Sequence, residues 1–262
     1  LKLEWIKGAD NLPIALQPSA FDAKPLLRDR GGVSLESTKM PFFREAMRMG
    51  EEDRQNLLMF LDANNDGFAN SIIARIFDDT ANLIESSMVT PEIMRMALLT
   101  NDSGQSVSYD YNYDPQNTWK SKNLSTLTGT DKWSDHANSD PIGDIQNIKR
   151  QAASRGITLT RMIIGWGTWQ DLLANAKIRL GMNPMASAAA NVIVTDDQVK
   201  SFIQTATGIK IAVYEKLYKG LDDNEHYFYP NEGCATLLPA GTLGSTWYGT
   251  TPEEADLMSG NT

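Results

Sequence analysis

The chain has 262 residues, of which 33 are acidic and 24 basic, giving a formal net charge of −9 at pH 7. A chain of this length can bury an apolar core, and its negative charge disfavours nucleic-acid binding across the whole surface. No apolar run approaches the roughly 18 residues of a membrane-spanning helix, and no signal-like segment opens the chain. Because Cys234 is the single cysteine, no internal disulfide can form. We expect its side chain to pack as a small apolar group and the protein to reside in a reducing compartment. Because the first residue is Leu1 rather than Met, we expect the natural N-terminus to precede it.

Residues 13–60 predict an extended two-stranded arm rather than a compact domain. Gly31 and Gly32 allow a tight reversal, and residues 33–38 alternate apolar and polar side chains as a half-exposed strand does. The segment is dense in charge and poor in core residues, and a lone two-stranded unit is marginally stable. We therefore expect the arm to lie on another subunit. An ordinary hairpin folded onto its own domain is the alternative.

Residues 67–100 carry the clearest helical pattern of the chain. Apolar residues recur at spacings of three, four or seven and define one broad apolar face: Phe68, Ile72, Ile73, Ile76, Phe77, Ile84 and Met88. Thr90 followed by Pro91 is also a helix-start signature, so the helix is expected to restart or kink there. We expect it to end near residues 101–104, before a strand at 107–113.

Residues 140–215 predict a compact unit that mixes helices and strands. Asp140 and Pro141 open a helix that closes near Gly156. Further helices are expected at 168–180 and 196–207, and strands at 159–164, 192–194 and 209–214. Taken with the arm and the long helix, this alternation predicts an α+β protein.

Two segments could be mistaken for metal sites. Asp62 to Gly67 matches the first half of a calcium loop, but Ile73 stands where the loop needs a bidentate Glu. We expect a polar turn that caps the long helix instead. The acidic run Asp222 to His226 places neighbouring side chains in different directions, so a solvated hairpin turn is expected there. No metal or cofactor is predicted.

The stretch from Gly165 to Thr168 follows a strand and precedes a helix, as phosphate-binding loops do. The third glycine of such a loop is missing and Trp166 occupies its centre, which favours an ordinary turn with buried tryptophans. His136 has no visible triad partner, and no nucleophile elbow, zinc-helix or Walker motif is present. The sequence therefore predicts no enzyme, with catalysis by a pair of carboxylates as the remaining possibility.

Three stretches of the chain, taken in order, carry a family resemblance. The first runs from Arg28 to Phe42 and continues through residues 50–57. The second begins at Trp133 and leads into the helix that starts at Pro141. The third covers residues 214–230 and 237–254, ending in Tyr-Gly-Thr-Thr-Pro-Glu-Glu. Together they resemble the lambda-type major capsid protein E family of tailed phages.

The resemblance implies the Hong Kong 97-type capsid fold, an α+β architecture. Residues 13–60 would be its E-loop arm, residues 140–235 its A-domain, and residues 1–12, 61–139 and 236–262 its P-domain with the helix 67–100 as spine. Trp247, Tyr248 and Pro252 would then pack inside the P-domain. Implied subunit-interface groups are Arg28, Arg30, Gly31, Gly32, Arg44, Arg48, Glu51, Glu52, Asp53 and Arg54.

The implied function is self-assembly, as pentamers and hexamers, into the icosahedral head of a double-stranded-DNA phage or prophage. Implied partners are further copies of the chain, together with scaffold, portal and decoration proteins. The shell would enclose the DNA without sequence-specific binding, and no membrane would be involved. The shell would assemble in the host bacterial cytoplasm and become the virion capsid. Related capsid chains continue beyond the Pro-Glu-Glu stretch, so we expect residues past Thr262 to complete the P-domain sheet.

Two alternatives of other kinds stay open at this point. An encapsulin-like compartment has the same fold but encloses an enzyme cargo. An α/β enzyme would use residues 140–235, with a ligand between Gly165 and Thr168.

Overall fold

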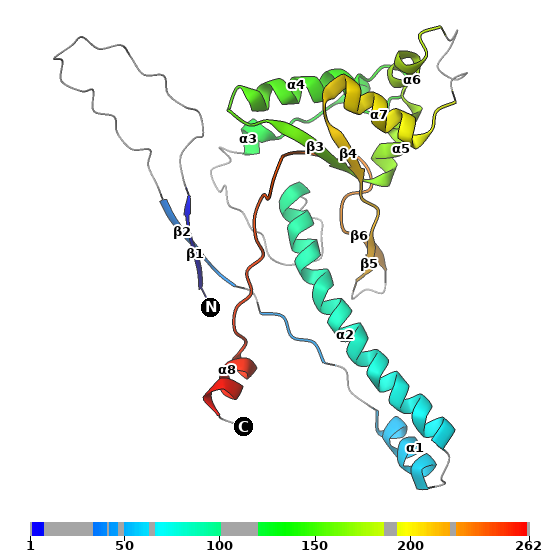
Figure 1. Cartoon of the computed structure of the whole chain (residues 1–262), viewed down its shortest axis with the longest axis vertical. Helices are drawn as coiled ribbons and strands as arrows, with labels where there is room; N and C mark the ends of the chain where they lie inside the picture. The colour runs from blue at the N-terminus through cyan, green and yellow to red at the C-terminus, as the bar shows by residue number, and fades with distance from the viewer. Residues whose placement is uncertain are drawn as a thin grey trace, which may run out of the picture. The chain divides into compact units, whose positions relative to one another are not determined.

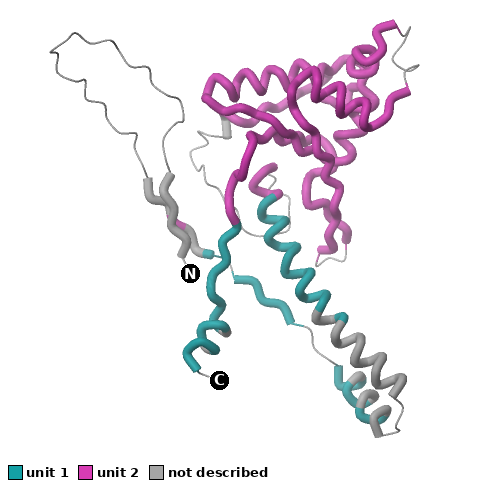
Figure 2. The backbone as a smooth tube through the Cα atoms, viewed as in Figure 1, with its two compact units in different colours: residues 1, 39–95, 246–262 teal, residues 2–38, 96–245 magenta. Residues whose placement is uncertain are grey.

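The computed structural model describes most of the chain as two compact units (Figure 2). Unit 1 comprises residues 1, 39–95 and 246–262, and unit 2 comprises residues 2–38 and 96–245. The described residues are 2–7, 34–40, 42–46, 50–62, 66–100, 120–185, 193–220 and 224–260. The predicted turn of the arm and the predicted strand at 107–113 lie outside them.

Unit 1 consists of helices and extended chain. Its helices are α1 (Glu51–Asp62), α2 (Asp66–Thr100, whose last turn falls in unit 2) and α8 (Pro252–Ser259). The long helix is confirmed at both ends, but it continues through Pro91, so a restart at that residue is wrong. Helix α1 lies within the stretch predicted as an extended arm. Glu51 and Glu52 in its first turn favour a helix start, because carboxylates offset the positive end of the helix dipole.

The N-terminal part of unit 2 contains a two-stranded sheet of β1 (Lys2–Lys7) and β2 (Ser34–Lys39). The predicted strand at 33–38 is thus confirmed within one residue. Its partner strand, β1, lies before residues 13–60, whereas the prediction placed both strands of the arm within them.

The centre of unit 2 is a three-stranded mixed sheet surrounded by helices (Figure 1). Strand β3 (Leu159–Ile164) is central and pairs in parallel with β4 (Lys210–Val213) and antiparallel with β7 (Ala235–Pro239). The helices are α4 (Pro141–Ala153), α5 (Trp166–Ala174), α6 (Ala176–Met182) and α7 (Asp196–Thr207). Helix α7 contacts α4, α6 and β4, while α4 also contacts β3. The predicted strands at 159–164 and 209–214 and the helix at 196–207 are therefore confirmed within one residue, and α5 and α6 stand in place of one helix at 168–180. The predicted strand at 192–194 is wrong, since residues 193 and 194 belong to no strand.

The hydrophobic core of unit 2 lies between this sheet and its helices. Met162 and Ile164 of β3 are fully buried, and each such side chain contributes roughly 1.5–3 kcal/mol relative to an exposed one. The remaining core members come from the helices and from the strand ends: Ile145, Leu159, Trp169, Leu172, Ile178, Val199, Ile203, Ile209 and Ile211. The core is thus drawn from six elements, namely β3, β4 and the helices α4 to α7.

Local sequence signals fix the ends of the helices around this core. Asp140 caps α4 by accepting a hydrogen bond from the Gly143 amide at 3.0 Å. Gly208 ends α7 in the left-handed conformation, with φ of 71°, as a C-terminal glycine commonly does. Lys149 of α4 donates to the carbonyl of Thr207, which binds the end of α7 to α4.

The remaining elements are short: α3 (Lys120–Asn123), a 3-10 turn at Gly129–Asp131, and a hairpin of β5 (Leu217–Lys219) and β6 (Glu225–Tyr227). Among the described helices, none combines the length and the apolar character that crossing a bilayer requires.

Candidate assembly surface

The start of α5, where a phosphate could have bound, is filled by the chain itself. The amide of Gly167 donates to the side-chain oxygen of Asn231 at 3.0 Å, and the amide of Thr168 donates to the Asn231 carbonyl at 3.0 Å. A Cβ atom at Gly165 would come within 2.2 Å of the Pro230 carbonyl oxygen. Gly165 and Gly167 therefore allow residues 230–232 to lie close to the start of α5. The amides that would bind an anion already donate hydrogen bonds to Asn231.

The tryptophans of this turn differ in their surroundings. Trp169 is 1% exposed and donates its indole N–H to Asp196 at 3.1 Å, with Lys200 Nζ 5.3 Å from the ring centre. Trp166 is 48% exposed, so the prediction of burial is confirmed for Trp169 and wrong for Trp166.

A buried hydrogen-bond network surrounds Tyr229 on the strand β7 side of the sheet. Its hydroxyl donates to the carbonyl of Ile163 at 2.9 Å and lies 2.9 Å from the Thr236 hydroxyl. Thr236 in turn bonds the Leu99 carbonyl at 3.3 Å, near the end of α2. Burial raises the pKa of Tyr229, and the nearby Cys234 adds to that rise. Cys234 is half-buried and accepts from this hydroxyl at 3.5 Å, which suits a structural thiol.

His136 does have a carboxylate neighbour, which sequence reasoning missed. Its Nε2 lies 2.8 Å from Asp171 Oδ1 of α5, and its carbonyl accepts from the Ala176 amide at 2.8 Å. The two side chains are far apart in sequence, and no motif links them. The side-chain pair thus links the loop before α4 to α5, and the His136 carbonyl links the same loop to the start of α6.

The two segments that could be mistaken for metal sites lie partly outside the described residues, since residues 63–65 and 221–223 are not described. His226 stacks on Tyr218 with ring centroids 5.5 Å apart. In the parts of the chain that are described, no three His, Cys, Asp or Glu side chains come together as a metal ion would need.

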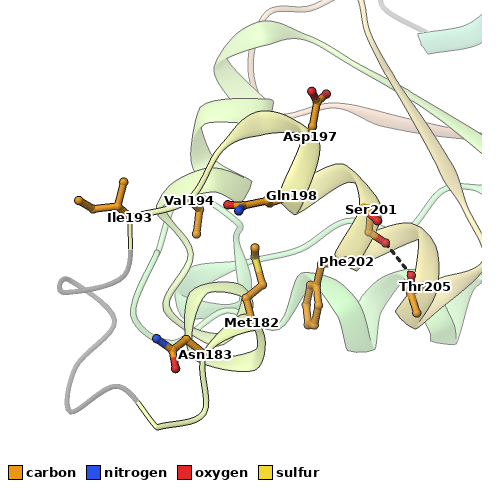
Figure 3. A pocket seen from close by; sticks show the side chains of 9 residues that line it. All are labelled: Met182, Asn183, Ile193, Val194, Asp197, Gln198, Ser201, Phe202 and Thr205. Carbon is orange, nitrogen blue, oxygen red and sulfur yellow. Dashed lines mark hydrogen bonds between the residues drawn. The ribbon is translucent and has the colours of Figure 1, made fainter.

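An open pocket of about 720 Å³ lies between the end of α6 and α7 (Figure 3). Its apolar floor includes Met182, Val194 and Phe202, which also pack on the core. Asp197 is its one charged lining residue. The other polar lining residues are Asn183, Gln198, Ser201 and Thr205.

Unit 1 presents large apolar side chains to solvent on every described element. Of its described apolar side chains, Ile93 alone is buried, at 5% exposure. The exposed ones are Phe42, Phe43, Leu58, Met59, Ile84, Met88, Trp247, Tyr248, Leu257 and Met258. Trp247 and Tyr248 are 68% and 76% exposed, so the expectation that they pack inside their own domain is wrong for the single subunit. An exposed apolar set of this extent is typical of an interaction surface.

The predicted interface groups fall partly within this region. Arg44, Glu51, Glu52 and Arg54 are exposed in unit 1, and Asp53 lies in α1. The residues Arg28, Arg30, Gly31, Gly32 and Arg48 lie outside the described part of the chain. The exposed apolar residues were not predicted as interface groups. Two of them, Ile84 and Met88, were predicted only as members of the apolar face of α2.

Comparison with known proteins identifies the class. Residues 10–262 match the family described as Phage major capsid protein E, and the chain belongs to that family. It is a phage major capsid protein, a structural component of the virion rather than an enzyme. The α/β-enzyme alternative is therefore wrong, in agreement with the filled start of α5.

Two solved structures were also compared. A proposed prophage capsid protein of Escherichia coli CFT073 has 19% identity and a TM-score of 0.47, with 84% of this chain and 61% of that chain covered. A phage-related protein of Bordetella bronchiseptica RB50 has 19% identity and a TM-score of 0.31, with 42% and 33% covered. The chain thus spans less than two thirds of either protein. Among curated proteins, none matched the chain.

Proposed function

We propose that copies of this chain assemble into the closed icosahedral shell of a tailed-phage head. The observation that carries the proposal is the contrast between the two units. Unit 2 has an internal core, whereas the described side chains of unit 1 contribute one buried apolar residue and many exposed ones. A unit of this kind gains most of its stability from burial against other subunits.

The proposed organisation follows the Hong Kong 97-type plan. Residues 13–60 act as the arm that crosses a neighbouring subunit, α2 acts as the spine of the peripheral domain, and residues 140–235 form the axial domain. Family membership and the length of α2 support this assignment. The charged interface groups predicted from the sequence would pair with a neighbour at the rim of the contact, where they set its register.

The wider assembly is proposed on the same basis. Pentamers and hexamers of the chain enclose double-stranded DNA, and the net charge of −9 suits a wall that does not hold the DNA tightly. Scaffold, portal and decoration proteins join the shell in the host cytoplasm.

Trp247 and Tyr248 offer the sharpest test of this assembly. Covering side chains of this size contributes roughly 2–3 kcal/mol each, so their removal weakens every copy of the contact. The full chain should form closed shells or capsomers by electron microscopy and size exclusion. The double variant Trp247→Ser, Tyr248→Ser should stay monomeric with an unchanged far-UV spectrum.

The matched control is Leu124→Ser, which removes an apolar side chain of 63% exposure from unit 2. It should assemble like the unaltered chain. Normal shells from the double variant, or an unaltered chain that stays monomeric, would contradict the proposal.

A further inference from the structure

The β5–β6 hairpin of unit 2 is a small sheet with two different faces. The register pairs Leu217 with Tyr227, Tyr218 with His226, and Lys219 with Glu225 (Figure 1 shows the two strands). Because side chains alternate along a strand, Tyr218 and His226 share one face. The other four side chains share the opposite face, which we call the outer face: Leu217, Lys219, Glu225 and Tyr227.

The inner face holds the hairpin in place. Tyr218 and Phe228 are 8% and 4% exposed, with ring centroids 4.9 Å apart, and His226 stacks on Tyr218. Beyond Phe228 the chain runs directly into Asn231, which is bonded to the start of α5. The hairpin is therefore anchored at its base, and ordering it on binding costs little entropy.

The outer face is exposed although half of it is apolar. Leu217 and Tyr227 are 46% and 40% exposed and stand directly opposite each other. Lys219 and Glu225, both exposed, form the next pair along the strands. The outer face thus carries an apolar pair beside a pair of opposite charges.

This pattern is complementary to itself. If a second hairpin lies face to face with the first, related by a twofold axis parallel to the strands, β5 of each copy covers β6 of the other. Lys219 then meets Glu225 of the second copy, and Leu217 meets Tyr227 of the second copy, each twice. A partner of one charge sign would meet both attraction and repulsion on the same face. A self-complementary patch is what a twofold contact between identical chains requires.

We infer that the outer face of the β5–β6 hairpin is a twofold contact between two copies of this chain. The inference rests on the proposed assembly function and names one contact within it. The apolar pair supplies the buried area. The flanking charges select the arrangement in which β5 of each copy covers β6 of the other.

Charge reversal tests the contact, with sedimentation velocity on the full chain as the measurement. Lys219→Glu places like charges together in both cross-copy pairs, and Glu225→Lys does the same with the opposite sign. Each single variant should self-associate about tenfold more weakly. An equimolar mixture of the two single variants should associate like the unaltered chain, because each copy then meets opposite charges on the other.

The mixture separates contacts between copies from pairing within one hairpin. In the mixture every hairpin still carries two like charges of its own, and only pairs between copies are corrected. A mixture no stronger than the single variants, or single variants equal to the unaltered chain, would overturn the inference. Leu217→Ser, which changes no charge, should weaken association alone and in every mixture, and normal association of this variant would also overturn it.

The control reverses a charge pair elsewhere in unit 2, with Asp131→Lys and Lys132→Glu, both exposed. These variants should associate normally, and weakening as strong as at the hairpin would overturn the inference. Normal shells from the hairpin variants refute the hairpin contact while leaving the capsid function intact. Absence of any association in the unaltered chain refutes both.

Discussion

Replacing Gly165 with alanine tests how closely residues 230–232 approach the start of α5. The backbone at Gly165 has φ of −74° and ψ of 164°, which any residue adopts without strain. The added methyl group, however, would lie 2.2 Å from the Pro230 carbonyl oxygen and 2.4 Å from the Asn231 carbonyl oxygen. Both are main-chain atoms, so the segment must move as a whole.

The expected cost follows from what this movement breaks. Forcing one methyl group into a filled space costs roughly 1–3 kcal/mol. Displacement of Asn231 also removes the hydrogen bonds to the amides of Gly167 and Thr168, worth roughly 0.5–1.5 kcal/mol each. We therefore expect Gly165→Ala to lower the free energy of unfolding of unit 2 by about 2–6 kcal/mol.

Urea unfolding followed by near-UV circular dichroism measures this effect, since the buried Trp169 is close to the altered turn. A loss of this size lowers the urea midpoint by roughly 1–3 M. Gly244→Ala is the control, because its methyl group meets nothing within 4 Å, and it should change stability by less than about 0.5 kcal/mol. Gly167→Ala should fall between the two, since its closest neighbour is the movable side chain of Glu232. Equal stability of the Gly165→Ala and Gly244→Ala variants would refute the close approach.

Two further predictions concern buried polar side chains. Tyr229→Phe should cost about 1–3 kcal/mol, because the hydrogen bonds of its hydroxyl to the Ile163 carbonyl and the Thr236 hydroxyl are lost, while the exposed Tyr248→Phe should cost nothing measurable in the same urea assay. Because burial raises the pKa of Tyr229, the unfolded chain loses the phenol proton at a lower pH than the folded chain does. The free energy of unfolding should therefore fall as the pH rises above about 10. An unfolding free energy that does not change at alkaline pH would contradict this. Asn175→Ala should lower stability by about 2–3 kcal/mol, since its side chain is fully buried, caps α6 and donates to a hydroxyl. Thermal unfolding should show no such loss for the exposed Asn183→Ala, and a similar loss in both would argue against a specific role of the cap.

Local signals were enough to predict most helices and the central strand. Asp140 with Pro141 marks the start of α4, and Gly208 marks the end of α7, because caps act within a few residues. The apolar run of β3 predicts a buried strand in the same way. What the sequence could not supply was the pairing of β3 with β7, or the position of Asn231 at the start of α5. Both depend on contacts between segments more than 60 residues apart, for which no local pattern exists.

The candidate surface shows a different limit of sequence reasoning. Ile84 and Met88 repeat at helical spacing, which indicates an apolar face but not which molecule covers it. In the single chain they are 57% and 70% exposed. A face buried within one subunit and a face buried between subunits carry the same pattern, since the same burial drives both. Only the three-dimensional structure separates the two cases.

The pairing of β3 has a consequence for synthesis of the chain. Its antiparallel neighbour, β7, ends at Pro239, so one edge of the central strand stays open until the ribosome has passed that residue. At roughly 5–20 residues per second, the 75 residues that separate Ile164 from Pro239 take about 4–15 s to make. The sheet of unit 2 thus closes only after the long helix has been made. The core of a nascent subunit is therefore completed only once residues 1–239 have left the ribosome.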